Sequence, residues 1–371
     1  MKNSILKTAI ASALVLSAFA DTATAATIYD KDGTTLSING RIRARGSNGD
    51  IAPYPTTARK SGTLSNNARF GIEGSSEITN GIKAFAFTQW DTADGNHRES
   101  FGTRDQYVGV DFGNYGKVTL GRYLSPVYNV LAGTDIHYDF SGLLLADCTR
   151  RPGQIKYSFD YNGFSGEFAY QTAQDEAGVG FEKSIDVNSG FSTNLGYTFD
   201  DVVFGPLSLK LGYEYLKGQK EESASAGDYN NIKVYAAGLV WGHFRSGPYV
   251  ALSYSESDHS VKSYQKDFKI KGLESVFGYG FENGIYADVG YDWQKYVPDN
   301  KTEANQSVET KGIIATVAWT LNPQFEVALE TYFSLENDAD KKHEAASGGD
   351  YYTTPYSKKE HAVGLNVVYF L

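Results

Sequence analysis

Residues 39–49 read NGRIRARGSNG, with arginine at positions 41, 43 and 45 and the apolar Ile42 and Ala44 between them. A period of two residues is typical of a β-strand, because successive side chains point to opposite faces. In a membrane, an arginine on the lipid face near the midplane costs about 2–4 kcal/mol. We therefore expect Arg41, Arg43 and Arg45 to line a water-filled interior, with Ile42 and Ala44 facing outward.

The same alternation recurs through the rest of the chain without a helical interruption. In residues 284–293, GIYADVGYDW, Val289 belongs to an apolar set and Asp288 and Asp292 to the more polar set. Short turns such as Asn162-Gly163 alternate with long polar loops, which is typical of an antiparallel meander with two unlike ends. The pattern predicts about sixteen strands, near 35–46, 66–77, 82–92, 104–113, 116–124, 153–161, 164–173, 190–199, 206–217, 231–242, 248–257, 268–281, 284–296, 308–321, 324–335 and 359–371.

Alternation alone does not separate a soluble β-sandwich from a membrane barrel, because both have one polar and one apolar face. Aromatic residues crowd the strand ends, for example Tyr213, Trp241 and Trp319, as in the girdles of membrane barrels. No linker divides the chain, and a closed barrel is the β architecture that leaves no edge in lipid. The sequence therefore predicts an all-β protein, a closed antiparallel transmembrane barrel over residues 26–371.

The first 25 residues have the features of a cleaved signal peptide. Lys2 and Lys7 precede the apolar run at 10–20, and Ala23-Thr24-Ala25 has the small-x-small pattern of a cleavage site. The alternative, a membrane anchor, needs about 20 apolar residues. We expect an exported chain that begins at residue 26.

Composition and motifs argue against several other classes of protein. Cys148 is the single cysteine, so no internal disulfide holds the fold, and the net charge of −10 argues against nucleic acid as a partner. No G-x-S-x-G or H-E-x-x-H motif occurs, so we expect no enzyme, and we expect no cofactor. Residues 30–33, DKDG, resemble the start of a calcium loop but lack its later ligands, which favours a turn before the first long strand.

A barrel of about sixteen strands encloses an aqueous channel, which something must narrow. Residues 125–153 form the connection that stands out for length, nearly thirty residues, and include the apolar run Leu143-Leu144-Leu145. We expect this third loop to fold into the lumen and carry Asp135 and Asp139; the alternative is an ordinary external loop. Acids facing bases set up a transverse field across a pore, and the predicted basic wall consists of Arg41, Arg43, Arg69, Arg122, Arg150 and Arg151.

Three stretches resemble the general porins of Gram-negative outer membranes. They are ATIYDKDGTTLSINGR at 26–41, ARFGIEGSSEITNGIKAFAFTQWD at 68–91 and GKVTLGRY at 116–123. The resemblance implies a sixteen-stranded barrel, a homotrimer and a third loop inside the pore. It also implies that Arg41, Arg69, Arg122 and one of Arg150 or Arg151 form the basic wall.

The chain departs from that family in two places. SPVYNVLAG at 125–133 stands where the family has Pro-Glu-Phe-Gly-Gly, which leaves the acidic partners open. Phe370 is followed by Leu371, whereas the family usually ends in phenylalanine, the residue that the barrel-assembly machinery recognises. The other partners that the resemblance implies are outer-membrane lipids, lipopolysaccharide, ions and small hydrophilic solutes.

The leading interpretation is a passive diffusion channel in the outer membrane. The alternative within transport is a solute-selective porin, for example for oligosaccharides, with an aromatic track to which Tyr138, Phe140 and Trp90 could contribute. Adhesion or phage reception through the outer loops is compatible with either. Ion selectivity stays open, because the arginines favour anions while the overall charge favours cations.

Overall fold

The computed structural model describes residues 25–48, 63–92, 101–139, 150–179, 182–219, 229–261, 267–299, 307–335 and 361–371. Within these ranges the chain is almost entirely β-strand, with a short 3-10 turn at Gly113–Tyr115 and one helical turn, α2, at Tyr128–Leu131. None of the helices in the described part of the chain is long and apolar enough to cross a membrane. The strands are β1 (Ala26–Lys31), β2 (Thr34–Asn48), β3 (Thr63–Thr79), β4 (Ile82–Thr92), β5 (Phe101–Asp111), β6 (Lys117–Leu124), β7 (Arg150–Tyr161), β8 (Phe164–Gln171), β9 (Gln174–Val179), β10 (Glu182–Val202), β11 (Gly205–Gly218), β12 (Tyr229–His243), β13 (Ser246–Val261), β14 (Phe268–Gly280), β15 (Ile285–Pro298), β16 (Val308–Asn322), β17 (Phe325–Leu335) and β18 (His361–Phe370).

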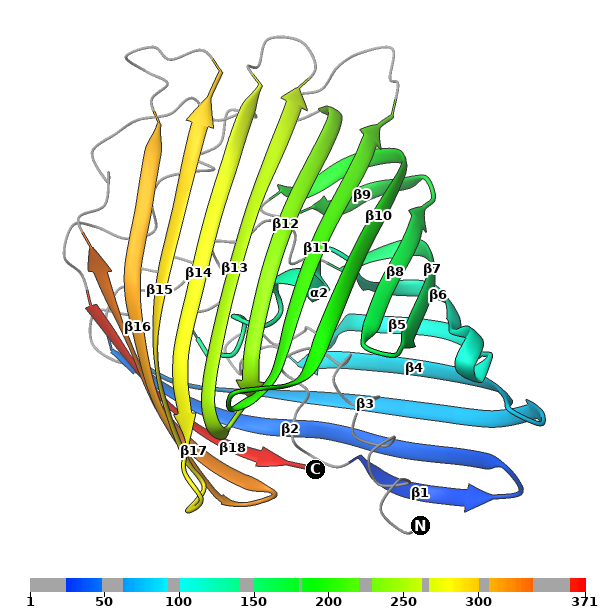
Figure 1. Cartoon of the computed structure of the whole chain (residues 1–371), viewed down its shortest axis with the longest axis horizontal. Coiled ribbons are helices and arrows are strands. Elements are labelled where there is room, and N and C mark those ends of the chain that lie inside the picture. The colour runs from blue at the N-terminus through cyan, green and yellow to red at the C-terminus, as the bar shows by residue number, and fades with distance from the viewer. Residues whose placement is uncertain are drawn as a thin grey trace.

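Sixteen of these strands form one closed antiparallel ring, as the sequence predicts (Figure 1). Strands β2–β8 and β10–β18 pair in chain order, and β8 pairs with β10. The seam is made by β18 and β2, where Tyr369 stands opposite Ile42. The two remaining strands extend the ring: β1 forms a hairpin with β2, and β9 pairs with the first residues of β10. Residues 174–179 and 182–189, which lie between the predicted strands at 164–173 and 190–199, are therefore strand as well.

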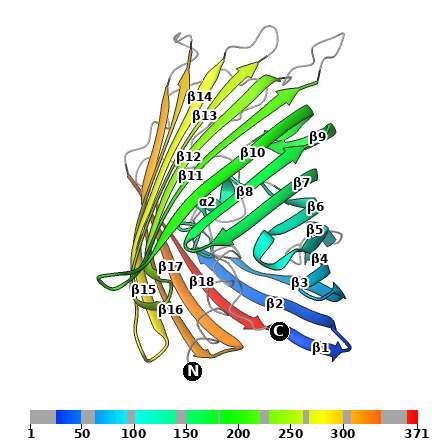
Figure 2. The same cartoon turned by 45° about the vertical axis from the view of Figure 1, so that its right-hand side comes forward.

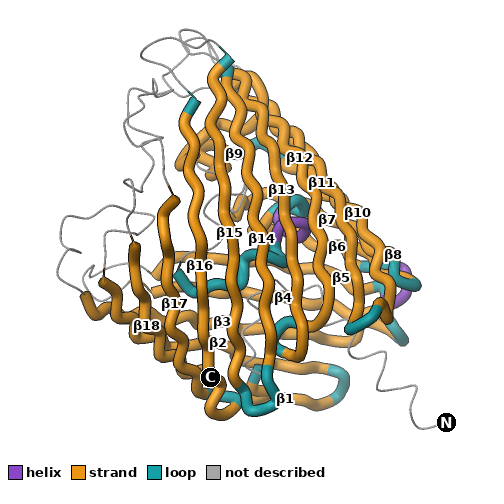
Figure 3. Tube along the Cα trace, turned by 60° about the vertical axis from the view of Figure 1, so that its left-hand side comes forward, coloured by secondary structure: helices purple, strands orange, loops and turns teal. Residues whose placement is uncertain are grey.

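One end of the barrel carries the short turns that the sequence predicts. The β7–β8 hairpin turns at Asn162 and Gly163, whose φ angles of +50° and +81° are those of a tight primed turn. Asp32 and Gly33, at +54° and +72°, make the equivalent turn between β1 and β2, so the DKDG stretch is a turn, as expected. The C-terminal residue lies at this same end (Figure 3). In membrane barrels the short turns face the periplasm.

The outward face of the barrel is apolar along most of its height. Leu211, Phe277 and Val289 are among its exposed residues, whereas Asp288 and Asp292 are buried on the inward face. The two sets of residues 284–293 therefore face as predicted. Residues Ile42 and Arg41 follow the same rule, with the isoleucine exposed and the arginine buried.

The alternation reverses at the end away from the short turns. Above an outward row of aromatics that includes Tyr235 and Trp293, the outward positions on β12–β16 are charged, as at Lys271 and Lys295. The inward positions there are apolar and buried, as at Ile270. These strands stand side by side as a tall wall (Figures 1 and 2), which therefore rises beyond the hydrocarbon and has its own apolar core on the inside.

Candidate functional site: the inner wall and the segment that follows it

Residues 125–139 lie against the inward face of the barrel, strand after strand. The carbonyl of Pro126 accepts a hydrogen bond of 2.7 Å from Asn194 on β10, and the carbonyl of Leu131 accepts one of 3.2 Å from Ser253 on β13. Glu274 on β14 and Glu330 on β17 also bind this segment. The described part of the predicted third loop thus runs around the inside of the wall from β6 toward β18; residues 140–149 of that loop lie outside the described residues.

Glycine on the wall allows the helical turn α2 to approach it closely. A Cβ atom on Gly238 of β12 would lie 2.0 Å from the carbonyl oxygen of Val130, a contact that no side chain tolerates. A Cβ on Gly212 of β11 would lie 2.9 Å from the Val130 side chain. Val127, Val130 and Leu131 pack into the apolar core inside the tall wall. This packing fixes the start of the segment and directs the residues that follow it toward β14.

Carboxylates on the wall hold the second half of the segment. Glu274 on β14 accepts a hydrogen bond of 2.9 Å from the Thr134 hydroxyl. Glu330 on β17 accepts bonds of 2.8 and 2.9 Å from the backbone N–H groups of Tyr138 and Asp139. One carboxylate that satisfies two consecutive amides orients the chain strongly, because charge-assisted bonds are about twice as strong as neutral ones.

His137 lies between these two attachments and is fully buried. Its Nε2 atom lies 2.8 Å from a carboxylate oxygen of Asp288 on β15. Burial lowers the pKa of His137, but the hydrogen bond and the charge of Asp288 outweigh that effect and raise the pKa to about 9. The imidazole is therefore protonated at neutral pH and forms an ion pair with the wall.

Asp139 connects the segment to β2. Its carboxylate lies 2.9 Å from Nε of Arg45 and 3.5 Å from Arg43, and it accepts a hydrogen bond of 2.8 Å from Asn366 on β18. The carbonyl of Tyr138 accepts a further bond of 3.1 Å from Arg43. Of the two acids predicted to face the arginines, Asp139 therefore touches them, whereas Asp135 accepts a hydrogen bond of 2.7 Å from Tyr128 of its own segment.

A second group of charges lies on β3, β4 and β5. Arg69 and Arg104 both bind Asp91, each through a contact of 2.8 Å, and Arg104 also donates to Gln89 at 3.0 Å. Sequence reasoning missed Arg104. Counting in twos from the exposed Val108 puts it on the outward face, but the β4–β5 register shifts between Thr88 and Trp90, and the extra residue there turns Arg104 inward.

Arg150 and Arg151, next to each other on β7, have different partners. The side chain of Arg151 is almost fully buried in an ion pair with Glu214 on β11. Arg150 binds Asp105 on β5 at 2.9 Å. Buried pairs of this kind position the chain, and removing one partner is far more costly than replacing both.

Arg122 is the predicted wall residue whose position differs from the expectation. It stands in register with Gln106, on the side of the β5–β6 ladder where Val108 and Leu120 are exposed, and it donates to the carbonyl of Arg104 at 3.0 Å. Its Cβ therefore lies on the outward row. A period of two residues groups Arg122 with Val118 and Leu120, so the alternation within β6 itself places Arg122 outward, against the expectation.

Two of the three aromatic residues considered for a track, Trp90 and Tyr138, lie apart on different faces of the barrel wall. Trp90 stacks between Phe70 and Phe101 on the outward face, with ring centroids 6.2 and 5.6 Å away. The Tyr138 hydroxyl accepts a hydrogen bond of 3.0 Å from Arg245. Phe140 lies outside the described residues.

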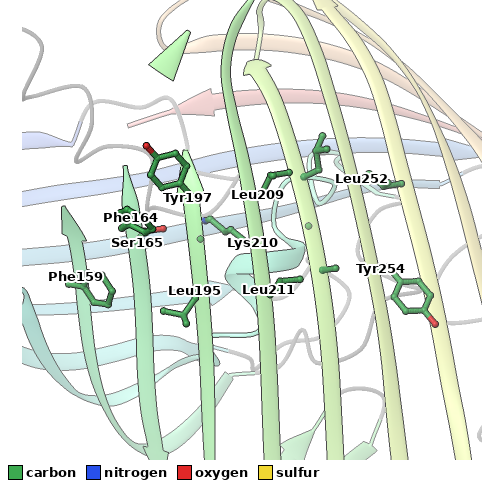
Figure 4. A pocket seen from close by; sticks show the side chains of 14 residues that line it. Phe159, Phe164, Ser165, Leu195, Tyr197, Leu209, Lys210, Leu211, Leu252 and Tyr254 are labelled. Atoms are coloured by element: carbon green, nitrogen blue, oxygen red, sulfur yellow. The ribbon is translucent and has the colours of Figure 1, made fainter. Parts of the chain in front are cut away.

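An apolar groove of about 740 Å³ is separate from this site. It crosses the outward face from β7 to β13, and Figure 4 shows Leu195, Leu209 and Leu211 among its lining. All three leucines are exposed and belong to the lipid-facing row. The groove is therefore part of the outer surface and not of the inner wall.

Comparison with known proteins agrees with this arrangement. The sequence model described as "Gram-negative porin" matches residues 11–371. Outer membrane porin C of Serratia marcescens is 27% identical over 308 residues, which cover 74% of this chain and 77% of that protein. Outer membrane porin PhoE of Klebsiella oxytoca is 26% identical over 279 residues, covering 72% and 76%.

Solved structures show the same fold at lower sequence identity. OmpF of Salmonella typhi superposes with a TM-score of 0.73 at 20% identity, covering 93% of this chain and all of that one. An anion-selective porin of Comamonas acidovorans superposes with a TM-score of 0.64 at 16% identity, covering 91% and 100%. The closed ring, the apolar exterior and the charged interior agree with the sequence match. The chain belongs to the Gram-negative porin family.

Proposed function

We propose that this outer-membrane porin is a passive channel for ions and small hydrophilic solutes, with its narrowest part beside residues 134–139. The observation that carries the proposal is the distribution of charge on the inner wall. Arg43, Arg45, Arg69 and Arg104 lie on β2, β3 and β5, and carboxylates including Glu274 and Glu330 lie on β14 and β17. Opposed charges create a field across the lumen, which favours polar solutes over apolar ones.

The arginines in this proposal are partly compensated where they stand. Asp139 forms ion pairs with Arg43 and Arg45, and Asp91 forms ion pairs with Arg69 and Arg104. Two carboxylates for four guanidinium groups leave an excess of positive charge on this side of the lumen. We therefore expect a moderate preference for anions near β2–β5, opposed by the acids of the facing wall.

Single-channel recording in a planar bilayer tests the proposal. Folded, purified protein should give stable ohmic steps in KCl, and its reversal potential in a salt gradient reports the balance between the two walls. The absence of ion conduction from folded protein would refute the channel.

We propose a homotrimer on the basis of the outward row of β5 and β6. Arg122 and Gln106 lie there beside exposed Val108 and Leu120. A guanidinium facing lipid is costly, by about 2–4 kcal/mol near the midplane, so a face with arginine fits contact with protein better than contact with lipid. One solved relative, OmpT of Vibrio cholerae, is described in a trimer form. Three equal conductance steps per insertion would support the trimer, and single steps throughout would contradict it.

The tall wall is the proposed lipid-facing side. Tyr235 and Trp293 lie at the upper limit of its apolar face, and Lys271 and Lys295 stand opposite each other just above them. This order fits the headgroup region of the outer leaflet, where lipopolysaccharide carries phosphate. Lys271→Glu with Lys295→Glu should reduce the lipopolysaccharide that copurifies with the folded protein; an unchanged amount would contradict the assignment.

Two expectations concern export and assembly. Residues 1–25 are the proposed signal peptide, and all but the last of them lie outside the described residues. The proposed signal for the assembly machinery is the C-terminal strand, in which Tyr369 and Leu371 are exposed on the lipid side and Phe370 is buried on the inside. Mass spectrometry of the mature protein should find Ala26 at its N-terminus.

A further inference from the structure

Three aromatic rings follow the inner wall below the charged group on β3–β5. Phe85 and Phe87 lie on β4, and both contact Tyr107 of β5, with ring centroids 6.3 and 5.4 Å away. Tyr107 in turn makes an edge-to-face contact of 5.9 Å with Tyr123 of β6. We name Phe85, Phe87 and Tyr107 the aromatic lane; Tyr123 is buried behind it.

The register places the aromatic lane on the inward face. Phe87 stands opposite Glu73 of β3 and Tyr107 of β5, and Phe85 stands opposite Gly109. The neighbouring Val108 is exposed on the outward face, so Tyr107 and Gly109 point into the barrel.

A glycine lets one of these rings approach the wall closely. A Cβ on Gly109 would come within 2.3 Å of Cζ of Phe85 and 2.8 Å of its Cε2. The ring therefore covers the space that a side chain at position 109 would occupy. Phe85 packs edge to face with Tyr107, at an interplanar angle of 79°.

The aromatic lane begins directly below the arginines. Asp91, Gln89, Phe87 and Phe85 share the inward face of β4, and the first two bind Arg69 and Arg104. Side chains on one face of a strand repeat about every 7 Å. A solute that passes the charged group on this side next meets the rings, on the way to the short-turn end.

A carboxylate lies beside the rings. Glu73, opposite Phe87 on the inward face, is exposed, and in the described part of the chain it has no ion pair. A pyranose ring has an apolar face of C–H groups and a rim of hydroxyl groups. Flat aromatic faces suit the first, and an unpaired carboxylate accepts hydrogen bonds from the second.

We propose that the aromatic lane is a binding site for saccharide rings inside the lumen, which slows and guides them through the pore. This inference rests on the proposed channel function and adds a substrate class to it. Because saccharides are uncharged, their capture needs stacking as well as hydroxyl contacts, and the arginines and Asp91 supply the hydroxyl contacts without the aromatic surface.

The test is block of the ion current by sugar in a planar bilayer. Maltotriose added to the native protein in KCl should reduce the current with a measurable half-blocking concentration. Polyethylene glycol of similar mass, which has no ring, should block far less at the same concentration. If both probes reduce the current equally, the block reports size alone and the proposal is overturned.

Substitutions of the rings distinguish aromatic stacking from the effect of apolar volume. Phe85→Leu with Phe87→Leu keeps apolar volume but removes the flat faces, and it should raise the half-blocking concentration about tenfold. Each single variant, Phe85→Leu or Phe87→Leu, removes one ring and should weaken block in the same direction by a smaller factor. The matched control is Phe70→Leu on the outward face, which should leave block unchanged.

The outcomes distinguish this proposal from the channel itself. Current in KCl without sugar reports the channel, so native protein that conducts but is not blocked by maltotriose refutes the aromatic lane alone. Block that is unchanged in the double variant refutes it as well. If the double variant does not fold, the single Phe85→Leu and Phe87→Leu variants give the same decision.

Discussion

Replacing Asp139 by asparagine tests the charge balance of the inner wall most directly. The carboxylate side chain is 1% exposed and lies 2.9 Å from Arg45 and 3.5 Å from Arg43, so its loss leaves two guanidinium groups without their common counter-charge. Asparagine keeps the shape of the side chain and an oxygen that can accept the bond from Asn366. The substitution therefore adds one positive charge with little change in packing.

The size of the effect follows from Coulomb's law. For an ion about 8 Å away in water at about 0.1 M salt, one added charge changes the energy by about 0.2–0.5 kcal/mol. Anions gain and cations lose this amount, so the permeability ratio of chloride to potassium should rise about two- to sixfold. In a tenfold KCl gradient that is a shift in reversal potential of about 15–35 mV toward anions, for a pore that starts without selectivity.

The assay is the reversal potential of single trimers or single pores in a planar bilayer. The matched control is Asp201→Asn, since Asp201 is exposed at the β10–β11 hairpin and removes the same charge outside the lumen. A shift in the control of the same size would mean that total charge, and not position, sets selectivity. An unchanged reversal potential in Asp139→Asn would refute the placement of this group beside the path of the ions.

Three further predictions follow from contacts described above. Arg69→Gln should shift the reversal potential in the opposite direction, toward cations, by a similar amount; a shift toward anions would contradict its position at the lumen. Because its pKa is raised to about 9, His137 contributes stability that is complete below pH 6.5 and is lost as pH rises through 9, by up to about 3 kcal/mol. The temperature of thermal unfolding should therefore depend on pH in that window in the native protein but not in His137→Asn. An equal pH dependence in the variant would mean that the His137–Asp288 pair does not cause it. Arg151→Met should cost about 3–5 kcal/mol because it leaves Glu214 buried without its partner, and adding Glu214→Leu should recover most of that loss in urea unfolding.

Local alternation predicts most of the fold. The ring of sixteen strands, the hairpin turns and the facing of Arg41, Ile42, Asp288 and Val289 all follow from a period of two residues. The sequence also shows that the chain near residue 125 is unlike the polar loops. These features need no information about partners far along the chain.

The sequence does not reveal where the register between two neighbouring strands shifts. Arg104 points inward because the β4–β5 register shifts between Thr88 and Trp90. Arg122, by contrast, follows the alternation of its own strand, which places it outward with Leu120. The reversal of polarity at the upper ends of β12–β16 has a different cause: there the outward face meets water instead of lipid, and the inward face packs in an apolar core. A single alternation pattern read through both environments assigns Lys271 and Ile270 to the wrong sides.

The acidic side of the site depends on contacts between distant segments. Sequence analysis expects the acids on the third loop, whereas Glu274 and Glu330 lie on the wall and bind the loop through a hydroxyl and backbone amides. Both glutamates belong to predicted strands, and their inward facing is readable. Their binding partners cannot be predicted from the sequence, because every residue except proline has the same backbone N–H group.

The seam between β18 and β2 constrains the order of events in biogenesis. The two strands of the seam are far apart in the chain, since β2 ends at Asn48 and β18 begins at His361. Until both are present, two rows of unpaired N–H and C=O groups remain, and hydrocarbon cannot accommodate either row. Stepwise insertion from the N-terminus is thus closed to this chain. We therefore expect the cylinder to close only once both strands of the seam have reached the membrane.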